Sequence, residues 1–399
     1  MQSKNIFPIL GMNTVSDTAR QHGNFVRLAN NVNINANGTI ELRAGKDKVT
    51  DTPISHLWQS PLHKDVFGLY DGYWCMVNPH DWTLRQLAEI GNAPLYHALV
   101  NNRVIVAGKN GLYEYDGHSA KPLTIPTPPP PMVQGQSQGQ DFGECVSGLD
   151  ETTHKARTRV IAISYLAGQK EGGLSSTVKV DADNVTITLP MVFDKAVTHI
   201  NIYTTEQGGA ELKLLASVPK DTAEYRFDTG AILGKPATTQ HLDPMMTGKY
   251  LALWRGRLVV AKSNVIYFSE PLNYHLTDER HNYIAMPQRV TFLEVVDGGM
   301  WVGQTTGVAF LQGVDIDEMS ISHKAVQAPI ADSSTQMPSE TVGELSNGGS
   351  SVALWLSANG YCVGTSDGSI VEYHAGVMNG IAGIGSTAQV GQRVVTAIN

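Results

Sequence analysis

The chain is poor in charge and in cysteine. Only 17 % of its 399 residues are charged, whereas about a quarter is usual for globular proteins. The formal net charge of −8 argues against an adhesive nucleic-acid binder, which carries a basic patch. It still permits a surface past which DNA slides without sticking. The three cysteines, Cys75, Cys145 and Cys362, are odd in number and far apart. This pattern excludes a disulfide framework or a zinc-ligand spacing and is typical of a reducing cytoplasm.

Long apolar runs are also missing. No segment approaches the roughly 20 apolar residues of a membrane span, and the apolar part of residues 1–13 is too short for a signal peptide. We therefore expect a chain that is made in the cytoplasm and has no membrane anchor. What the sequence does have is 39 glycines, 19 prolines and 42 % hydrophobic residues, which favours a β-rich globular protein with many turns.

A repeat emerges when residues 96–117 are set against 250–271. The two segments align without a gap, and eight positions carry the same residue. Their shared frame is a strand, a two-residue turn, a strand with a small residue, a second turn and an aromatic strand. The segments 57–76, 292–313 and 352–373 fit the same frame. Asn-Gly or Asp-Gly steps at 71–72, 110–111 and 367–368 supply the positive φ that tight hairpins need.

The small residue of each frame gives the period. It is found at Gly68, Ala107, Ala261, Gly303 and Gly364; the first two frames are 39 residues apart, the third and fourth 42, and the last two 61 across a polar segment. Short strands with this period indicate the blades of a β-propeller. A small residue in mid-strand suits a crowded centre where backbones approach closely. An unrelated array of β-sandwich or barrel strands remains the alternative, because any β-meander places glycine turns between hydrophobic runs.

The gap between the second and third frames is too wide for one blade. A Pro run and then a Gln/Gly run predict an extended linker over residues 117–150. Alternating strands at sandwich spacing predict an inserted β-sandwich domain over 151–235. We therefore expect an all-β chain in which residues 1–116 form the first part of a propeller and 236–399 form the second.

The two ends suggest how the propeller closes. Residues 24–45 read as a hairpin around Asn37-Gly38, and 392–398 read as a lone strand with no partner nearby in sequence. Because a propeller must leave no open sheet edge, we predict that strands from both termini share one blade, which gives about six blades. The polar segment 316–346 is expected to be a long loop that reaches a neighbouring subunit.

Two motifs match catalytic or phosphate-binding patterns only formally. Residues Gly135–Gly139 spell GxSxG, but they lie in the Gln/Gly linker and lack the strand and helix that a nucleophile elbow needs. Residues Gly380–Gly385 resemble a phosphate-binding turn without its βαβ context. We interpret the first as linker and the second as a flexible connection to the last strand.

Metal and cofactor signals are weak. The acidic stretch Asp181–Asn184 offers oxygen ligands of the kind that calcium prefers, but a solvated turn of the inserted domain explains it. The stretch Asp315–Glu318 could line an opening, and an exposed loop is the simpler interpretation. None of the 13 histidines pairs at HxH or HxxxH spacing. We therefore expect no catalytic, cofactor-binding or metal-binding residue, and no cofactor.

Five of the six tryptophans lie inside the repeat frames, which predicts that they pack the blades. An exposed aromatic platform for a sugar is the alternative role. These five residues are Trp58, Trp74, Trp254, Trp301 and Trp355.

With these features together, the chain resembles the tail hub or nozzle structural proteins of tailed, in particular short-tailed, bacteriophages. The likeness covers most of the chain and rests on four stretches. They are the opening 11–45, the phrase LALWRGRLVVAKSNVIYFSEP at 251–271, a fibronectin type III-like insert ending in YRFDTG, and blade-type segments to the end.

The resemblance implies a virion component without a catalytic centre. It would form a ring of identical copies, with six as the expected number, that closes and then opens the DNA exit channel. Its other partners would be the portal or adaptor, other tail proteins, and fibres or spikes. DNA would pass without sequence-specific binding, and the acidic balance suits such passage. The competing interpretations are a propeller that binds a receptor or glycan, and a propeller glycosidase or lyase, which needs two carboxylates or a His/Tyr set at the central channel.

Overall fold

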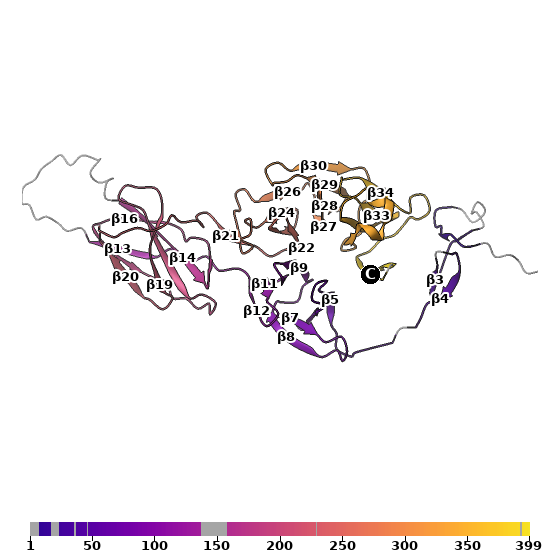
Figure 1. Ribbon diagram of the computed structural model, residues 1–399, viewed down its shortest axis with the longest axis horizontal. Coiled ribbons are helices and arrows are strands. Elements are labelled where there is room, and N and C mark those ends of the chain that lie inside the picture. The colour runs from indigo at the N-terminus through magenta and orange to yellow at the C-terminus, as the bar shows by residue number, and fades with distance from the viewer. Residues whose placement is uncertain are drawn as a thin grey trace, which may run out of the picture.

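The computed structural model describes residues 8–16, 24–35, 37–45, 47–136, 158–228, 230–391 and 393–399. This part of the chain consists of strands and loops, with two short 3-10 turns, η1 (Ser339–Thr341) and η2 (Gly343–Ser346). The predicted all-β class is confirmed. None of the described helices has the length and apolar character to cross a membrane. In Figure 1 an eight-stranded unit lies at one end, a curved array of sheets in the middle, and an N-terminal hairpin at the other end.

The array consists of five four-stranded antiparallel sheets within the described residues, which we call the first to fifth sheets. The first holds β5 (Ser55–Gln59), β6 (Val66–Tyr70), β7 (Tyr73–Val77) and β8 (Leu84–Glu89). The second holds β9 (Tyr96–Val100), β10 (Arg103–Gly108), β11 (Gly111–Tyr115) and β12 (Ala120–Pro122). The third holds β22 (Lys249–Trp254), β23 (Arg257–Lys262), β24 (Val265–Phe268) and β26 (Tyr283–Ala285).

The last two sheets follow without interruption. The fourth holds β27 (Val290–Val296), β28 (Gly299–Gln304), β29 (Gly307–Gln312) and β30 (Ser320–Lys324). The fifth holds β31 (Thr335–Pro338), β32 (Ser351–Ser357), β33 (Gly360–Gly364) and β34 (Ile370–Glu372). Consecutive sheets lie side by side along an arc (Figure 1), so the architecture is propeller-like, as the repeat predicts.

A hydrophobic cluster joins each pair of neighbouring sheets. Between the first and second, Phe67 packs edge-on against Tyr115 with ring centroids 5.6 Å apart. Between the fourth and fifth, the rings of Trp301 and Trp355 lie 5.5 Å apart. Burying these large rings supplies much of the stabilisation of such an array. The packing role predicted for the frame tryptophans is confirmed for Trp74, Trp254, Trp301 and Trp355, which are at most 2 % exposed.

The small residues of the frames are crowded by aromatic side chains. A Cβ added at Gly303 would collide with the ring of Phe292, the residue opposite it on β27. A Cβ at Gly364 would collide with the indole of Trp301 from the preceding sheet. In the fifth sheet the frame covers β32–β34 rather than its first three strands. At these two positions side-chain rings, and not converging backbones, require a small residue.

The unit between the second and third sheets has two layers over one core. A three-stranded sheet of β13 (Met132–Gln136), β17 (Asn184–Thr188) and β20 (Glu224–Phe227) forms one layer. The other layer holds β14 (Thr158–Ala167), β15 (Lys170–Glu171), β16 (Val178–Asp181), β18 (His199–Thr204) and β19 (Lys213–Pro219). Ile187 of the first layer and Ile163 of the second are fully buried in one cluster. We call this unit the insert.

The insert is attached to the array by polar contacts. The Lys170 ammonium lies 3.0 Å from the carboxylate of Glu114 on β11, and a ring nitrogen of His275 lies 2.9 Å from the backbone oxygen of Glu171. His275 precedes β25 (Leu276–Thr277), which pairs with β21 (Asp243–Pro244) on the chain leaving the insert.

The segment expected to be linker contributes two strands. β12 completes the second sheet, and β13 joins the insert, so the extended connection within the described part is shorter than 117–150. The Pro-rich residues between β12 and β13 carry few backbone N–H donors, which explains why they form a strand in neither the second sheet nor the insert. The remainder, 137–157, lies outside the described residues.

The long loop expected over 316–346 is wrong. That segment holds β30, β31, η1 and η2. β30 is an outer strand with mostly exposed side chains, so it lacks the apolar alternation that marks a half-buried strand. Polar composition therefore concealed two strands of the array.

Strands near both chain ends pair locally. β1 (Gly11–Met12) runs parallel to β2 (Phe25–Val26), whereas β3 (Val32–Ile34) forms an antiparallel hairpin with β4 (Ile40–Leu42) across the expected Asn37-Gly38 turn. β36 (Arg393–Ile398) pairs with β35 (Gly385–Val390), so the expectation of a lone last strand is wrong. No ladder of the described residues joins the N-terminal strands to this C-terminal hairpin.

Candidate functional site

Side chains from several sheets converge where the first strands of the array meet. Tyr96 begins β9, Tyr250 lies on β22, and Asp332 lies in the segment before β31. Their positions in the chain span 236 residues, yet the Tyr96 hydroxyl donates to Asp332 Oδ1 at 3.2 Å. We call Tyr96, Tyr250 and Asp332 the central cluster.

The central cluster is compact and mostly neutral. The two tyrosine rings pack edge to face with centroids 5.0 Å apart. Burial, assisted by the Asp332 carboxylate, holds the pKa of both hydroxyls far above the ordinary value. Tyr250 has a φ of +57° at a bulge between Lys249 and Ala252, a conformation that costs free energy in a non-glycine residue. The surrounding contacts must hold it there.

Two histidines lie on the first-sheet side of this cluster. Burial lowers the pKa of His56, although the Asp332 carboxylate partly opposes that effect. Burial, assisted by the charge of His56, lowers the pKa of His97 to about 3, and its ring stacks on that of Trp58 with centroids 4.6 Å apart. His97 is therefore neutral at physiological pH and serves as a packing residue.

Glu294 on β27 has a pKa suited to proton transfer near neutral pH. Burial raises its pKa to about 7, and the Ser334 hydroxyl, which donates to the carboxylate at 2.7 Å, opposes this only partly. Such a carboxyl could supply a proton near neutral pH. Glycoside hydrolysis, however, needs a second carboxylate facing the first. Asp332 accepts a hydrogen bond from a tyrosine. The Ser334–Glu294 hydrogen bond connects β27 with the segment before β31.

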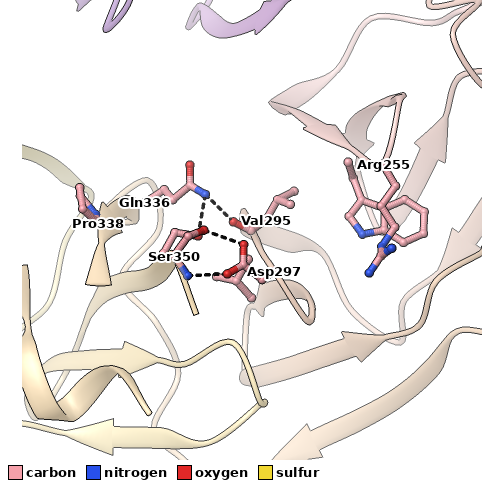
Figure 2. A pocket seen from close by; sticks show the side chains of 9 residues that line it. Arg255, Val295, Asp297, Gln336, Pro338 and Ser350 are labelled. Atoms are coloured by element: carbon pink, nitrogen blue, oxygen red, sulfur yellow. Dashed lines mark hydrogen bonds between the residues drawn. The ribbon is translucent and has the colours of Figure 1, made fainter. Parts of the chain in front are cut away.

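A groove of about 470 Å³ lies at the C-terminal ends of β22 and β27, whereas Tyr250 of the central cluster lies near the start of β22. One wall is the β22–β23 turn with Trp254 and Arg255, and the other comes from the end of β27 and from β31 and β32. Figure 2 shows Arg255 standing apart from the hydrogen-bonded residues of the facing wall. Arg255 is exposed.

The facing wall is held by its own polar network (Figure 2). Asp297 accepts from the backbone N–H of Ser350 and from its hydroxyl, the latter at 2.7 Å. Gln336 Nε2 donates to the backbone oxygen of Val295 at 2.8 Å. These bonds occupy Asp297 and lower its pKa, mainly through the Ser350 N–H. The groove is thus preformed; on one wall Arg255 has no ion pair among the described residues, and on the other Asp297 is hydrogen-bonded.

The motifs singled out in the sequence lie elsewhere. Gly135 lies on β13, and Ser137 of the GxSxG pattern lies outside the described residues. Asp181–Asn184 forms the turn between β16 and β17, as interpreted. In the loop between β29 and β30, Asp315 lies 3.7 Å from the Arg257 guanidinium. The described residues contain no group of three His, Cys, Asp or Glu side chains placed to hold a metal ion.

The central cluster and the groove were missed because their members belong to different repeats. The recurring tyrosine at the start of two frames, Tyr96 and Tyr250, was the available signal. The partner carboxylate, Asp332, lies in the segment taken for a loop. The Asp297-Gly298 step marks the turn of the groove wall in the same way as the other hairpin steps.

Comparisons with known proteins give the following. No family model matches the chain, and no curated protein matches it significantly. Among solved structures it is similar to BBS1N in complex with ARL6DN, with 12 % identity and a TM-score of 0.35 over 87 % of this chain and 90 % of that one. It is similar to Kluyveromyces lactis Hsv2, with 10 % identity and a TM-score of 0.29 over 79 % and 75 %.

A third similar structure is the Neurospora crassa Pan2 WD40 domain, with 10 % identity and a TM-score of 0.32 over 79 % of this chain and 77 % of that one. At such TM-scores these likenesses carry no argument about function. The propeller-like description rests on the order and packing of the five sheets themselves.

Proposed function

We propose that this chain is a structural protein of a phage tail. It would act as a hub or nozzle whose ring of identical copies closes and then opens the DNA exit channel, with six copies expected. Within the virion it would contact the portal or adaptor, other tail proteins, and fibres or spikes. The sequence resemblance at 11–45 and 251–271 motivates the proposal.

The observation that supports an assembly role is the two-stranded C-terminal hairpin beside the fifth sheet. The β35–β36 hairpin is hydrogen-bonded to the fifth sheet, with the Tyr361 hydroxyl on β33 donating to the Thr396 hydroxyl on β36 at 2.8 Å. The hairpin has only two strands, and Val390 and Val395 are 64 % and 48 % exposed. Two-stranded hairpins are marginal alone, and open sheet edges invite pairing.

The finer fold belongs to this proposal. The C-terminal hairpin would form part of a sixth blade, completed by N-terminal strands of the same chain or of a neighbouring copy. The C-terminus lies between the fifth and first sheets in Figure 1. Arg393 at the start of β36 donates to the Asn35 side chain at 3.2 Å. The C-terminal hairpin therefore contacts the β3–β4 hairpin. The insert would be a fibronectin type III-like sandwich that offers a docking surface.

The test is a density-gradient separation of a lysate from the source culture, probed with an antibody to this chain. Under the proposal the protein co-sediments with DNA-filled particles at a fixed stoichiometry, and imaging of those particles locates its ring. If the protein remains at the top of the gradient while particles band below, the tail function is wrong.

The groove of Figure 2 is the observation in favour of the second candidate, a receptor- or glycan-binding propeller. Trp254 lines it, and Arg255 is available for a polar ligand. Against this candidate, Trp254 is only 2 % exposed, so its ring does not offer the open face on which a sugar stacks. Binding of the purified chain to a glycan array, with a polysaccharide hydrolysis assay beside it, separates this candidate and the less favoured glycosidase or lyase from the tail protein.

A further inference from the structure

A small pocket between the third and fourth sheets is lined by three cations. Its volume is about 210 Å³, and Lys249, Lys262 and Arg289 contribute to its wall. The other lining residues are neutral, so no carboxylate belongs to the wall. They are Gly248, Tyr250, Ala261, Ser263 and Val290. We call this the cationic pocket.

The three cations have no counter-ion in the described part of the chain. None of them lies in an ion pair, whereas Arg257 on the same sheet pairs with Asp315, and Lys170 pairs with Glu114. Acidic residues outnumber basic ones by 37 to 29, so a cation of this chain has many possible partners. Like charges that share a site repel one another. Three like charges around one pocket without a carboxylate in its wall therefore favour an anionic ligand.

The backbone holds the pocket in a fixed shape. Lys249 pairs with Ala261 in the β22–β23 ladder, directly before Lys262. The N–H of Val290, the residue after Arg289, donates to Ser263 O at 2.9 Å. Gly248 is required because an added Cβ would lie 2.6 Å from Ala261 O. The start of β22, the end of β23 and the start of β27 thus meet around this pocket, and each contributes a basic residue at or next to that point.

The pocket lies beside the central cluster, since Tyr250 belongs to both. Asp332, the acidic group nearest to that tyrosine in electrostatic effect, accepts from Tyr96 and does not line the pocket. The charge of Arg289 acts on Tyr250 in the direction opposite to that of Asp332.

We propose that the cationic pocket binds a phosphate group. A guanidinium presents a planar fork that matches phosphate oxygens, and two ammonium groups add compact charge. DNA backbone and free phosphate are two sources of this chemistry, and the choice of DNA rests on the proposed function. On a chain of net charge −8, which repels DNA overall, one such pocket gives a local contact that does not depend on base sequence.

The experiment uses the full-length chain and two probes, a fluorescein-labelled duplex oligonucleotide in an anisotropy titration and inorganic phosphate in calorimetry. The test variant is Lys262→Gln/Arg289→Gln, and both residues are exposed. The control for lost charge is Lys195→Gln on the insert, also exposed. The control for retained charge is Lys262→Arg/Arg289→Lys. Thermal melting of every variant checks folding.

We expect the double glutamine variant to bind the duplex about tenfold more weakly at low salt, with a salt slope smaller by about 2. Both controls should bind as the wild type does. Phosphate binding that is lost in the double variant, without any duplex binding, supports the pocket with free phosphate as its ligand. If the double variant binds both probes as the wild type does, or if neither probe binds, the proposal is overturned. Co-sedimentation with particles is measured separately, so failure of the tail function is recognised independently.

Discussion

Glu294 makes the stability of the array depend on pH. Burial raises its pKa from the ordinary 4.5 to about 7, so the folded chain holds this proton more tightly than the unfolded chain does. The associated stability is fully present below about pH 4.5 and is lost as the pH rises through about 7. The ceiling of the effect is about 3 kcal/mol, because each pKa unit corresponds to about 1.4 kcal/mol. Since the side chain keeps some contact with solvent, we expect about 1 to 2 kcal/mol.

The perturbation is Glu294→Gln, which keeps the shape and still accepts from the Ser334 hydroxyl while removing the titration. Relative to the wild type, the variant should be more stable at pH 8 than at pH 5 by that 1 to 2 kcal/mol. Urea unfolding followed by tryptophan fluorescence measures this, because Trp74, Trp301 and Trp355 are buried in the array.

Glu279→Gln is the matched control, because Glu279 is exposed and its substitution should shift stability equally at both pH values. Ser334→Ala removes the hydroxyl that donates to Glu294, so it should enlarge the loss at pH 8. If Glu294→Gln changes the free energy of unfolding by the same amount at pH 5 and pH 8, the reasoning about this carboxyl is refuted.

Two further predictions concern packing and charge. Gly303→Ala should destabilise the chain by about 1 to 3 kcal/mol, because its methyl group collides with the Phe292 ring; Gly307→Ala, with open space around the added Cβ, should cost far less in the same melt. Glu114→Gln should lower the melting temperature at pH 7 through a loss of about 1 to 2 kcal/mol, because Glu114 is enclosed by three partly exposed cations, including Lys170 of the insert. Although burial raises its pKa, those cations outweigh that effect and lower it, so the loss should fade as the pH drops below about 4.5; an equal loss at pH 3 would contradict this account.

Local pattern was enough for strands that form continuous apolar runs between turns. The frame around Gly303 places the fully buried β28 between two turns, so its strands could be predicted from neighbouring residues. The Asp71-Gly72 step likewise predicted a turn, and both residues have positive φ. Strands that expose most of their side chains gave no such signal. β30 reads SISHK, and its place was set by pairing with β29.

The sequence by itself determined the all-β class, the repeated unit, the inserted unit and the packing role of the tryptophans, because each follows from contacts or turns that are short in sequence. Only the tertiary structure decided the central cluster, in which Tyr96 meets Asp332 across 236 residues. It also decided the partner of β36 and the grouping of Lys249, Lys262 and Arg289 around one pocket. Hydrophobic periodicity specifies which face of a strand is buried, but it carries no information about which sheet will lie against that face.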